Sequence, residues 1–401
     1  MPSTNHRPQA HSPLRTRDAP KQPAFLELFF DLVYVFALTQ LTHLLIDDLT
    51  LTGGFEALVL FLALWWLWVL TAWLTDQFDP QNTSVQWYVL VAMFGILLMA
   101  IQVPKGFDGN GLFFGVIFTV INLTRFLFVV CVARGTAVLR HATRAWFWAA
   151  ISTALWIPGA FLDGWARGIV WLAALAIDYV SAALRWPTPW RKRQQNTPVL
   201  EIIATHLAER YRQVFIIALG EIVLIMGLTF STSGYENFTL DRTLVLTLSY
   251  VSAALMWRLY IYQAGSQLAP AIAASRNPHR LSQWSAYAHI AMIAGSILTA
   301  VGFTLAIDHP TEMTPAAWIA GITGGPALFL AGRAGFEYVI FGRITPPRPV
   351  GIVVLAALSP AAIHLRPEVT LAAATLVLAG IAVWDTASGY RRAPKQVAPP
   401  A

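Results

Sequence analysis

Two carboxylic acids open the first apolar stretch of the chain. Glu27 and Asp31 are four residues apart, so on a helix they share one face, which continues to Tyr34. Gln40 lies further along on a different face. A carboxylate costs at least about 2.5 kcal/mol at the centre of a membrane helix, so such groups face protein or water and often mark substrate or proton pathways. This stretch is therefore the strongest candidate site.

A second polar helix is predicted near residues 206–229. Its ionisable candidates are His206, Glu209, Arg210 and Glu221. Glu221 comes close to the centre of its span, and the neighbouring Gly220 permits close approach of another helix. A carboxyl group at that depth can exchange a proton with water as access changes sides of the membrane. We therefore predict that Glu221 and Asp31 carry protons.

Further ionisable side chains fall inside apolar stretches, nearly all in the expected cytoplasmic half. The near balance of eight acids and five arginines predicts ion pairs between helices. We expect Arg125 and Arg258 each to contact an acid of another helix. The expected partners are Glu27, Asp31 and Asp178. The simpler interpretation is that such pairs only hold helices together. The remaining candidates for a substrate or proton site are Arg125, Arg258, Asp178 and Asp385.

Metal and cofactor chemistry finds no support in the residue pattern. His206 and Glu209 are three residues apart, but a carboxylate-bridged di-metal site would need two Glu-x-x-His helices and two further Glu. The chain has no P-loop, no G-x-S-x-G and no G-x-G-x-x-G after a strand, and its one cysteine is Cys131. We predict no metal and no cofactor.

The composition requires membrane helices to carry these residues. Of the 401 residues, 56% are apolar and 12% are charged, whereas about 25% are charged in ordinary soluble proteins. So little polar surface would not cover a soluble protein of this length. The net charge of +6 does not imply nucleic acid, because membrane proteins collect Lys and Arg in cytoplasmic loops. We predict an all-α polytopic membrane protein that contacts the lipid bilayer and no nucleic acid.

Twelve apolar stretches of roughly 20 residues are predicted to cross about 30 Å of hydrocarbon, of which the fifth and the eleventh are short and contain Pro158 and Pro360. The twelve stretches lie near 25–46, 56–76, 84–103, 112–133, 145–163, 166–185, 206–229, 243–264, 283–306, 316–341, 349–364 and 369–389. With the N-terminus inside, eighteen Lys and Arg of the loops and tails fall on the cytoplasmic side and four on the outer side. This bias predicts that both termini are cytoplasmic.

Two halves of the chain share short patterns in the same order. Span six ends with a D-x-x-S-x-x-x-R pattern that begins at Asp178, and span twelve ends with the same pattern from Asp385. Ala-Leu-Thr-Gln, ending at Gln40, likewise corresponds to Ala-Leu-Gly-Glu, ending at Glu221. An even number of spans gives both halves one orientation, so we predict two parallel six-helix repeats. The predicted divisions are a cytoplasmic tail at 1–24, halves at 25–185 and 206–389, a cytoplasmic linker at 186–205 and a second tail at 390–401.

The polar runs of spans one and seven resemble the bacterial low-temperature-requirement A family of multispan membrane proteins. The runs are E-L-F-F-D-L-V-Y-V-F-A-L-T-Q-L-T-H from Glu27, and H-x-x-E-R followed by I-I-A-L-G-E from His206. The Trp-rich second span ending Asp76-Gln-Phe-Asp79 also fits. The family is named for a growth phenotype in the cold, so the resemblance implies a bacterial cytoplasmic (inner) membrane protein and no substrate. It marks as motif positions Glu27, Asp31, His206, Glu209, Arg210 and Glu221.

Three functions are compatible with these features. The internal repeat favours a secondary transporter with its site between the halves near mid-membrane, coupled to protons through Asp31 and Glu221. An intramembrane enzyme could use the same acids as general acid and base on a lipid or another apolar substrate. A membrane stress or assembly factor would have no substrate. We expect the transporter rather than an enzyme, and a homo-oligomer is compatible with all three.

Overall fold

The computed structural model describes residues 13–15, 23–109, 111–189, 203–232 and 238–391. Most of the predicted tails and the greater part of the predicted linker lie outside the described residues. The described part is helical, and its β-structure is limited to an isolated bridge between Leu14 and Phe78. The prediction of an all-α protein is confirmed.

The first group of helices runs from α1 to α6. Its members are α1 (Phe25–Asp47), α2 (Leu51–Gln77), α3 (Thr83–Gln102) with the short 3-10 extension η1 (Val103–Lys105), α4 (Gly111–Val132), α5 (Ala137–Ala160) and α6 (Gly164–Ala183). The second group runs from α7 to α14. Its members are α7 (Ala204–Thr232), α8 (Leu240–Tyr260), α9 (Ser266–Ala274), α10 (Pro278–Asp308), α11 (Ala316–Ile319), α12 (Gly325–Phe341), α13 (Pro347–Ala362) and α14 (Pro367–Arg391).

Within the described ranges, nine helices are long and apolar enough to cross a membrane. They are α1, α2, α3 with η1, α4, α6, α7, α8, α10 and most of α14. Together with the composition, they make the chain an integral membrane protein. The other predicted spans also fall on helices, but α5, α12 and α13 lie outside this length and hydropathy criterion. Twelve crossings and cytoplasmic termini therefore stay predictions.

Local sequence explains where several helices begin and end. Thr50, Asn82, Thr136 and Thr239 each accept a hydrogen bond from a backbone N–H in the first turn of the helix that follows. Gly342 ends α12 with a φ of 66°, in the left-handed region that glycine adopts readily. Two π-helical segments, η3 (Ile261–Gly265) and η4 (Ala320–Gly324), join α8 to α9 and α11 to α12. π-Helical segments are rare in proteins, and those that occur are often found at functional sites.

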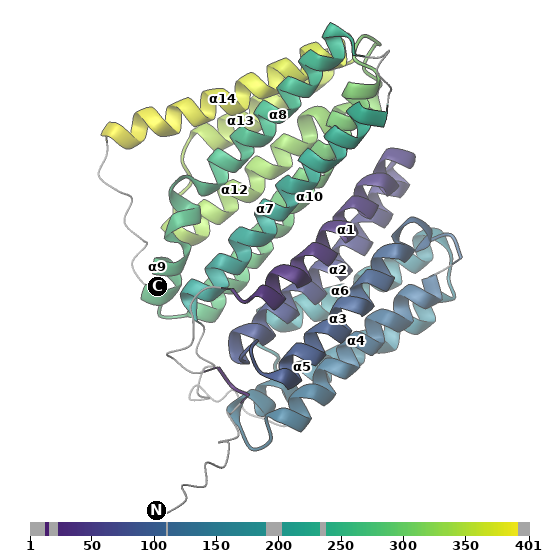
Figure 1. Ribbon diagram of the computed structural model, residues 1–401, viewed down its shortest axis with the longest axis vertical. Helices are drawn as coiled ribbons and strands as arrows, with labels where there is room; N and C mark the ends of the chain where they lie inside the picture. The colour runs from purple at the N-terminus through teal and green to yellow at the C-terminus, as the bar shows by residue number, and fades with distance from the viewer. Residues whose placement is uncertain (1–12, 16–22, 110, 190–202, 233–237, 392–401) are drawn as a thin grey trace, which may run out of the picture.

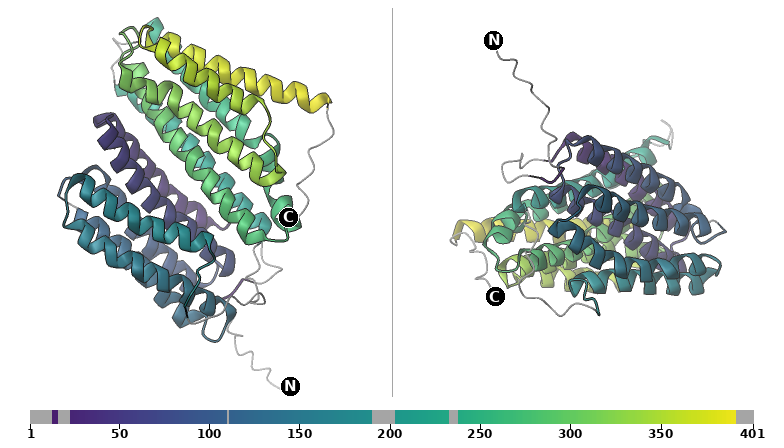
Figure 2. Two further views of the ribbon diagram at one scale, coloured as in Figure 1. Left: turned by 180° about the vertical axis from the view of Figure 1, so that it is seen from behind. Right: turned by 90° about the horizontal axis from the view of Figure 1, so that it is seen from below.

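The two groups of helices lie side by side (Figure 1). Contact between them runs mainly through α1 and α2 of the first group and α7 and α10 of the second. The view from behind shows the same division (Figure 2). Among the candidate spans, α2 and α10 are the most enclosed. The junction between the groups is therefore a buried interface.

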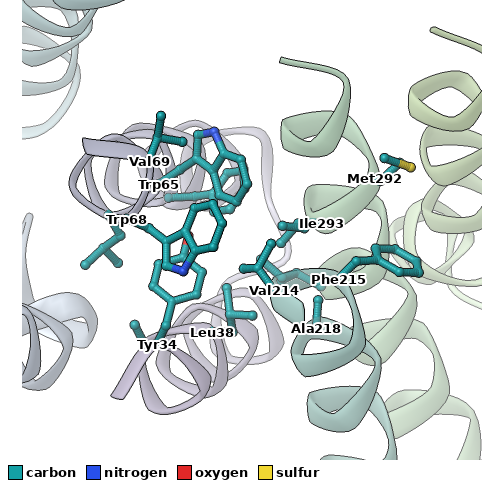
Figure 3. Close-up of a cluster of buried hydrophobic side chains, with 14 of the residues drawn as sticks. Tyr34, Leu38, Trp65, Trp68, Val69, Val214, Phe215, Ala218, Met292 and Ile293 are labelled. Atoms are coloured by element: carbon teal, nitrogen blue, oxygen red, sulfur yellow. The ribbon is translucent and has the colours of Figure 1, made fainter. Parts of the chain in front are cut away.

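This junction has an apolar and aromatic core (Figure 3). The side chains that fill it are Tyr34 and Leu38 of α1, Trp65, Trp68 and Val69 of α2, Val214, Phe215 and Ala218 of α7, and Met292 and Ile293 of α10. The rings of Trp65 and Trp68 stack with centroids 5.0 Å apart, and Trp68 lies 6.0 Å from Tyr211 of α7. Aromatic contact thus crosses from one group to the other beside the polar residues described next.

Candidate functional site

Five buried polar side chains meet near the beginning of α1 and α7. These residues, hereafter the polar cluster, are Glu27 and Asp31 of α1, Asp76 of α2, and His206 and Arg210 of α7. Each is at most 3% exposed. The cluster brings together four of the residues predicted from sequence, and it lies across the junction of the two groups of helices.

Arg210 holds Asp31 with two hydrogen bonds. Its Nη1 donates to Oδ2 at 2.7 Å and its Nη2 donates to Oδ1 at 2.9 Å. The indole Nε1 of Trp68 donates to the same carboxylate at 3.0 Å, and the guanidinium lies 5.4 Å from the centre of that ring. A bidentate, charge-assisted pair packed on an aromatic face compensates both buried charges.

His206 bridges two carboxylates of the other group of helices. Its Nε2 lies 3.0 and 3.1 Å from the two oxygens of Glu27, and its Nδ1 lies 3.1 Å from Oδ1 of Asp76. The backbone N–H groups of Ala24 and Ile203 donate to Glu27 at 2.8 Å and to Asp76 at 3.2 Å. Among the described residues, no group of three or more Asp, Glu, His or Cys is arranged to hold a metal ion.

Glu221 lies further along the same contact between α1 and α7. The hydroxyl of Thr39 donates to its Oε2 at 2.5 Å. The other carboxylate oxygen is buried and has no hydrogen-bond partner among the described residues. Because Thr39 is eight residues beyond Asp31, the two predicted proton carriers are about 12 Å apart along the helix. They occupy two positions on one interface rather than a single site.

Three other predicted residues lie apart from the polar cluster. Glu209 pairs with Arg212 on its own helix at 2.6 Å, where both side chains are about a third exposed. Asp178 accepts a hydrogen bond from Ser152 of α5 at 2.6 Å. Gln40 is half-buried on α1. None of the three contributes to the bridge between the groups of helices that the cluster forms.

Neither Arg125 nor Arg258 forms the ion pair predicted for it within the described part of the chain. Arg125 donates to Asn122 of its own helix at 3.3 Å. Arg258 donates to Thr386 at 3.4 Å and lies over the ring of Tyr262 at 4.8 Å. Both side chains are half-buried, and the Nε of Arg125 is buried without a hydrogen-bond partner among the described residues. The prediction of an acid within hydrogen-bonding reach is therefore wrong for both, although Asp178 of α6 is near enough to Arg125 to interact with it electrostatically.

Asp385 belongs to a second buried set of charges, in α12, α13 and α14. Arg348 donates to both of its carboxylate oxygens, at 2.7 and 2.5 Å, and lies 3.3 Å from Glu337. Arg333 donates to two backbone carbonyl oxygens in and beside the π segment η3. Arg348 falls between the predicted spans 316–341 and 349–364, whereas in the structure it lies in the first turn of α13 and its side chain is 1% exposed.

The partners that sequence reasoning missed are polar groups inside hydrophobic stretches. Asp76 and Trp68 are not among the site residues predicted from the sequence. Both belong to the Trp-rich second span that carries part of the family resemblance. Thr39 directly precedes Gln40 in the Ala-Leu-Thr-Gln stretch that corresponds to the Ala-Leu-Gly-Glu stretch ending at Glu221, and this correspondence was the available signal.

Comparison with known proteins identifies the family of the chain. The model of the family described as bacterial low temperature requirement A protein (LtrA) matches residues 24–383 and so includes the whole polar cluster. An uncharacterised protein of Rhizobium meliloti is 33% identical over 367 residues, which cover 90% of this chain and 88% of that protein. No solved structure matches the chain. The chain therefore belongs to the bacterial low temperature requirement A (LtrA) family.

Proposed function

We propose that this protein is a proton-coupled secondary transporter of the bacterial cytoplasmic membrane, with twelve spans in two parallel halves. The observation that carries the proposal is the position of the polar cluster and of Glu221, which lie along the contact between the two groups of helices. In transporters built from repeats, substrate and coupling-ion sites lie at such an interface.

The direction of α1 and α7 supports parallel halves. From the beginning of the helices onward, the contacts are Glu27 with His206, Asp31 with Arg210, and Thr39 with Glu221. Residue numbers increase together along this series, so the two helices run parallel. Halves inverted in the membrane would place their first helices antiparallel.

The scheme of neighbouring helices also supports a repeat. In the first group, α1 packs on α2 and α3, α2 packs on α6, and α3 to α6 pack in succession. In the second, α7 packs on α8 and α10, α8 packs on α14, and α10, α12, α13 and α14 pack in succession. The two schemes coincide when α8 with α9, and α11 with α12, are each counted as one span.

Everted membrane vesicles provide the test of transport. Respiration acidifies their interior and quenches acridine orange, and a solute exchanged for protons restores the fluorescence. With wild-type protein, at least one class among inorganic cations, organic cations, amino acids, sugars and organic anions should restore it. Failure of every class would contradict proton-coupled exchange. A change in membrane lipids that requires Glu221 would instead favour an intramembrane enzyme.

Topology reporters test the twelve crossings. Fusions after Arg140 and Arg280 should report the cytoplasm, and fusions near Gly109 and Pro310 should report the outside, because the excess of Lys and Arg lies on the predicted inner loops. Alkaline phosphatase and green fluorescent protein activities provide opposite readouts at each position. A reversed readout at one position would disprove the predicted crossings around it.

A further inference from the structure

His206 faces a carboxylate with each of its two ring nitrogens. A neutral imidazole has one N–H and one nitrogen with a lone pair. A lone pair against a carboxylate oxygen is repulsive, and burial strengthens the repulsion. Yet the distances from Nε2 to Glu27 and from Nδ1 to Asp76, 3.0 and 3.1 Å, are both those of hydrogen bonds. The bridge therefore needs two protons, either both on the ring or one of them on a carboxyl group.

The surrounding charges favour the same proton count. Among the described residues, the charged groups that face the bridge are Asp31 of α1, Arg210 of α7, and Arg15 of the segment 13–15. Arg15 donates to the carbonyl of the residue before Asp76. Within the described part of the chain, three buried carboxylates thus meet two arginines, and one further proton on the bridge balances these charges.

His289 differs from His206 because only one of its two partners is limited to accepting a hydrogen bond. Its Nε2 lies 3.0 Å from the hydroxyl of Tyr260, and its Nδ1 lies 2.7 Å from the carbonyl oxygen of Ser285. A neutral ring satisfies both, because it donates from Nδ1 and accepts from the tyrosine hydroxyl at Nε2. Both histidines are fully buried, but His289 needs one proton and the His206 bridge needs two.

We propose that Glu27, His206 and Asp76 form a proton-binding site that ties the beginning of α7 to α1 and α2. With the proton bound, the imidazole is hydrogen-bonded to both acids across the junction. When the proton passes to water at that end of the bundle, one N–H···O bond is replaced by a repulsive contact, and the two groups of helices are released from each other there. The inference rests on the proposed function in one respect only, that binding and release of this proton accompany transport.

Nuclear magnetic resonance of isotope-labelled histidine, with the protein in lipid bilayers, tests the proton count. At about pH 7, both ring nitrogens of His206 should resonate as N–H groups, whereas His289 should show one N–H and one bare nitrogen. His206→Gln and His289→Gln assign the signals, and selective labelling of the wild type assigns them if a variant does not fold. If the second proton is on a carboxyl group, the infrared band of a protonated acid should disappear in Glu27→Gln or Asp76→Asn. A bare His206 nitrogen without such a band would overturn the proposal.

Melting curves test whether the bound proton holds the two groups of helices together. Raising the pH from about 6 to about 9 should lower the melting temperature of the wild type and of the matched control His289→Gln by the same several degrees. His206→Gln should have a lower melting temperature than the wild type at about pH 6. Its melting temperature should not show this decrease as the pH is raised. An equal pH dependence in His206→Gln would show that the proton does not hold the helices together. The resonance and melting measurements need no substrate. They can therefore support the proton-binding site even if the vesicle assay contradicts transport, and they can contradict the site even if transport is observed.

Discussion

Replacing Arg210 with methionine should lower the free energy of unfolding by about 3–5 kcal/mol, because it leaves a buried carboxylate without its cation. Arg210 is 1% exposed and binds both oxygens of Asp31. Methionine keeps an unbranched apolar stem beside Trp68, so the loss mainly reports the missing charge. Chemical unfolding in detergent micelles, followed by tryptophan fluorescence, measures the change.

Arg212 is the matched control, two residues later on the same helix. Its pair with Glu209 is about a third exposed on both sides, so Arg212→Met should cost less than about 1 kcal/mol. Combining Asp31→Leu with Arg210→Met should recover much of the stability, because no unpaired buried charge remains. Equal losses for the two single arginine variants would contradict the argument from burial.

Solute-driven proton release should fall to background in Glu221→Gln, while its melting temperature stays close to that of the wild type. Glutamine keeps the shape of the side chain, and its amide oxygen can still accept the hydrogen bond from Thr39. Its amide group does not bind or release a proton at the pH of the assay. Glu221 contacts a hydroxyl through one oxygen, and the other has no hydrogen-bond partner in the described structure. The vesicle assay and a melting curve on the same preparation measure both quantities.

Glu209→Gln makes the same chemical change near the beginning of α7 and should retain transport. Wild-type activity in Glu221→Gln would remove this carboxyl group from the mechanism. If activity instead decreased only in proportion to the folded protein, the role of Glu221 would be structural. Asp31→Asn should behave differently from Glu221→Gln. The Asp31 carboxylate is bound by Arg210, so its loss should lower the stability of the protein as well as transport.

The sequence by itself determined the class of protein and the helices that carry the site. A chain with so few charged residues places its long apolar helices in lipid, because no other environment accepts that much apolar surface. Ionisable residues in such helices must then face protein or water. That requirement, with their spacing on one helix face, was enough to single out Glu27, Asp31, His206 and Arg210 before their partners were known.

Only the tertiary structure decided which of these groups meet. Asp31 and Arg210 are 179 positions apart, and helix periodicity predicts which side chains share a face but not which helix that face will contact. The crossing of α1, α2 and α7 made Asp76 a member of the polar cluster and placed Glu221 beside Thr39. Arg348 illustrates the same limit: its position suggested a loop, but the packing of α13 on α14 placed it against Asp385. A buried guanidinium requires an acceptor, and long-range packing determines which acceptor is within reach.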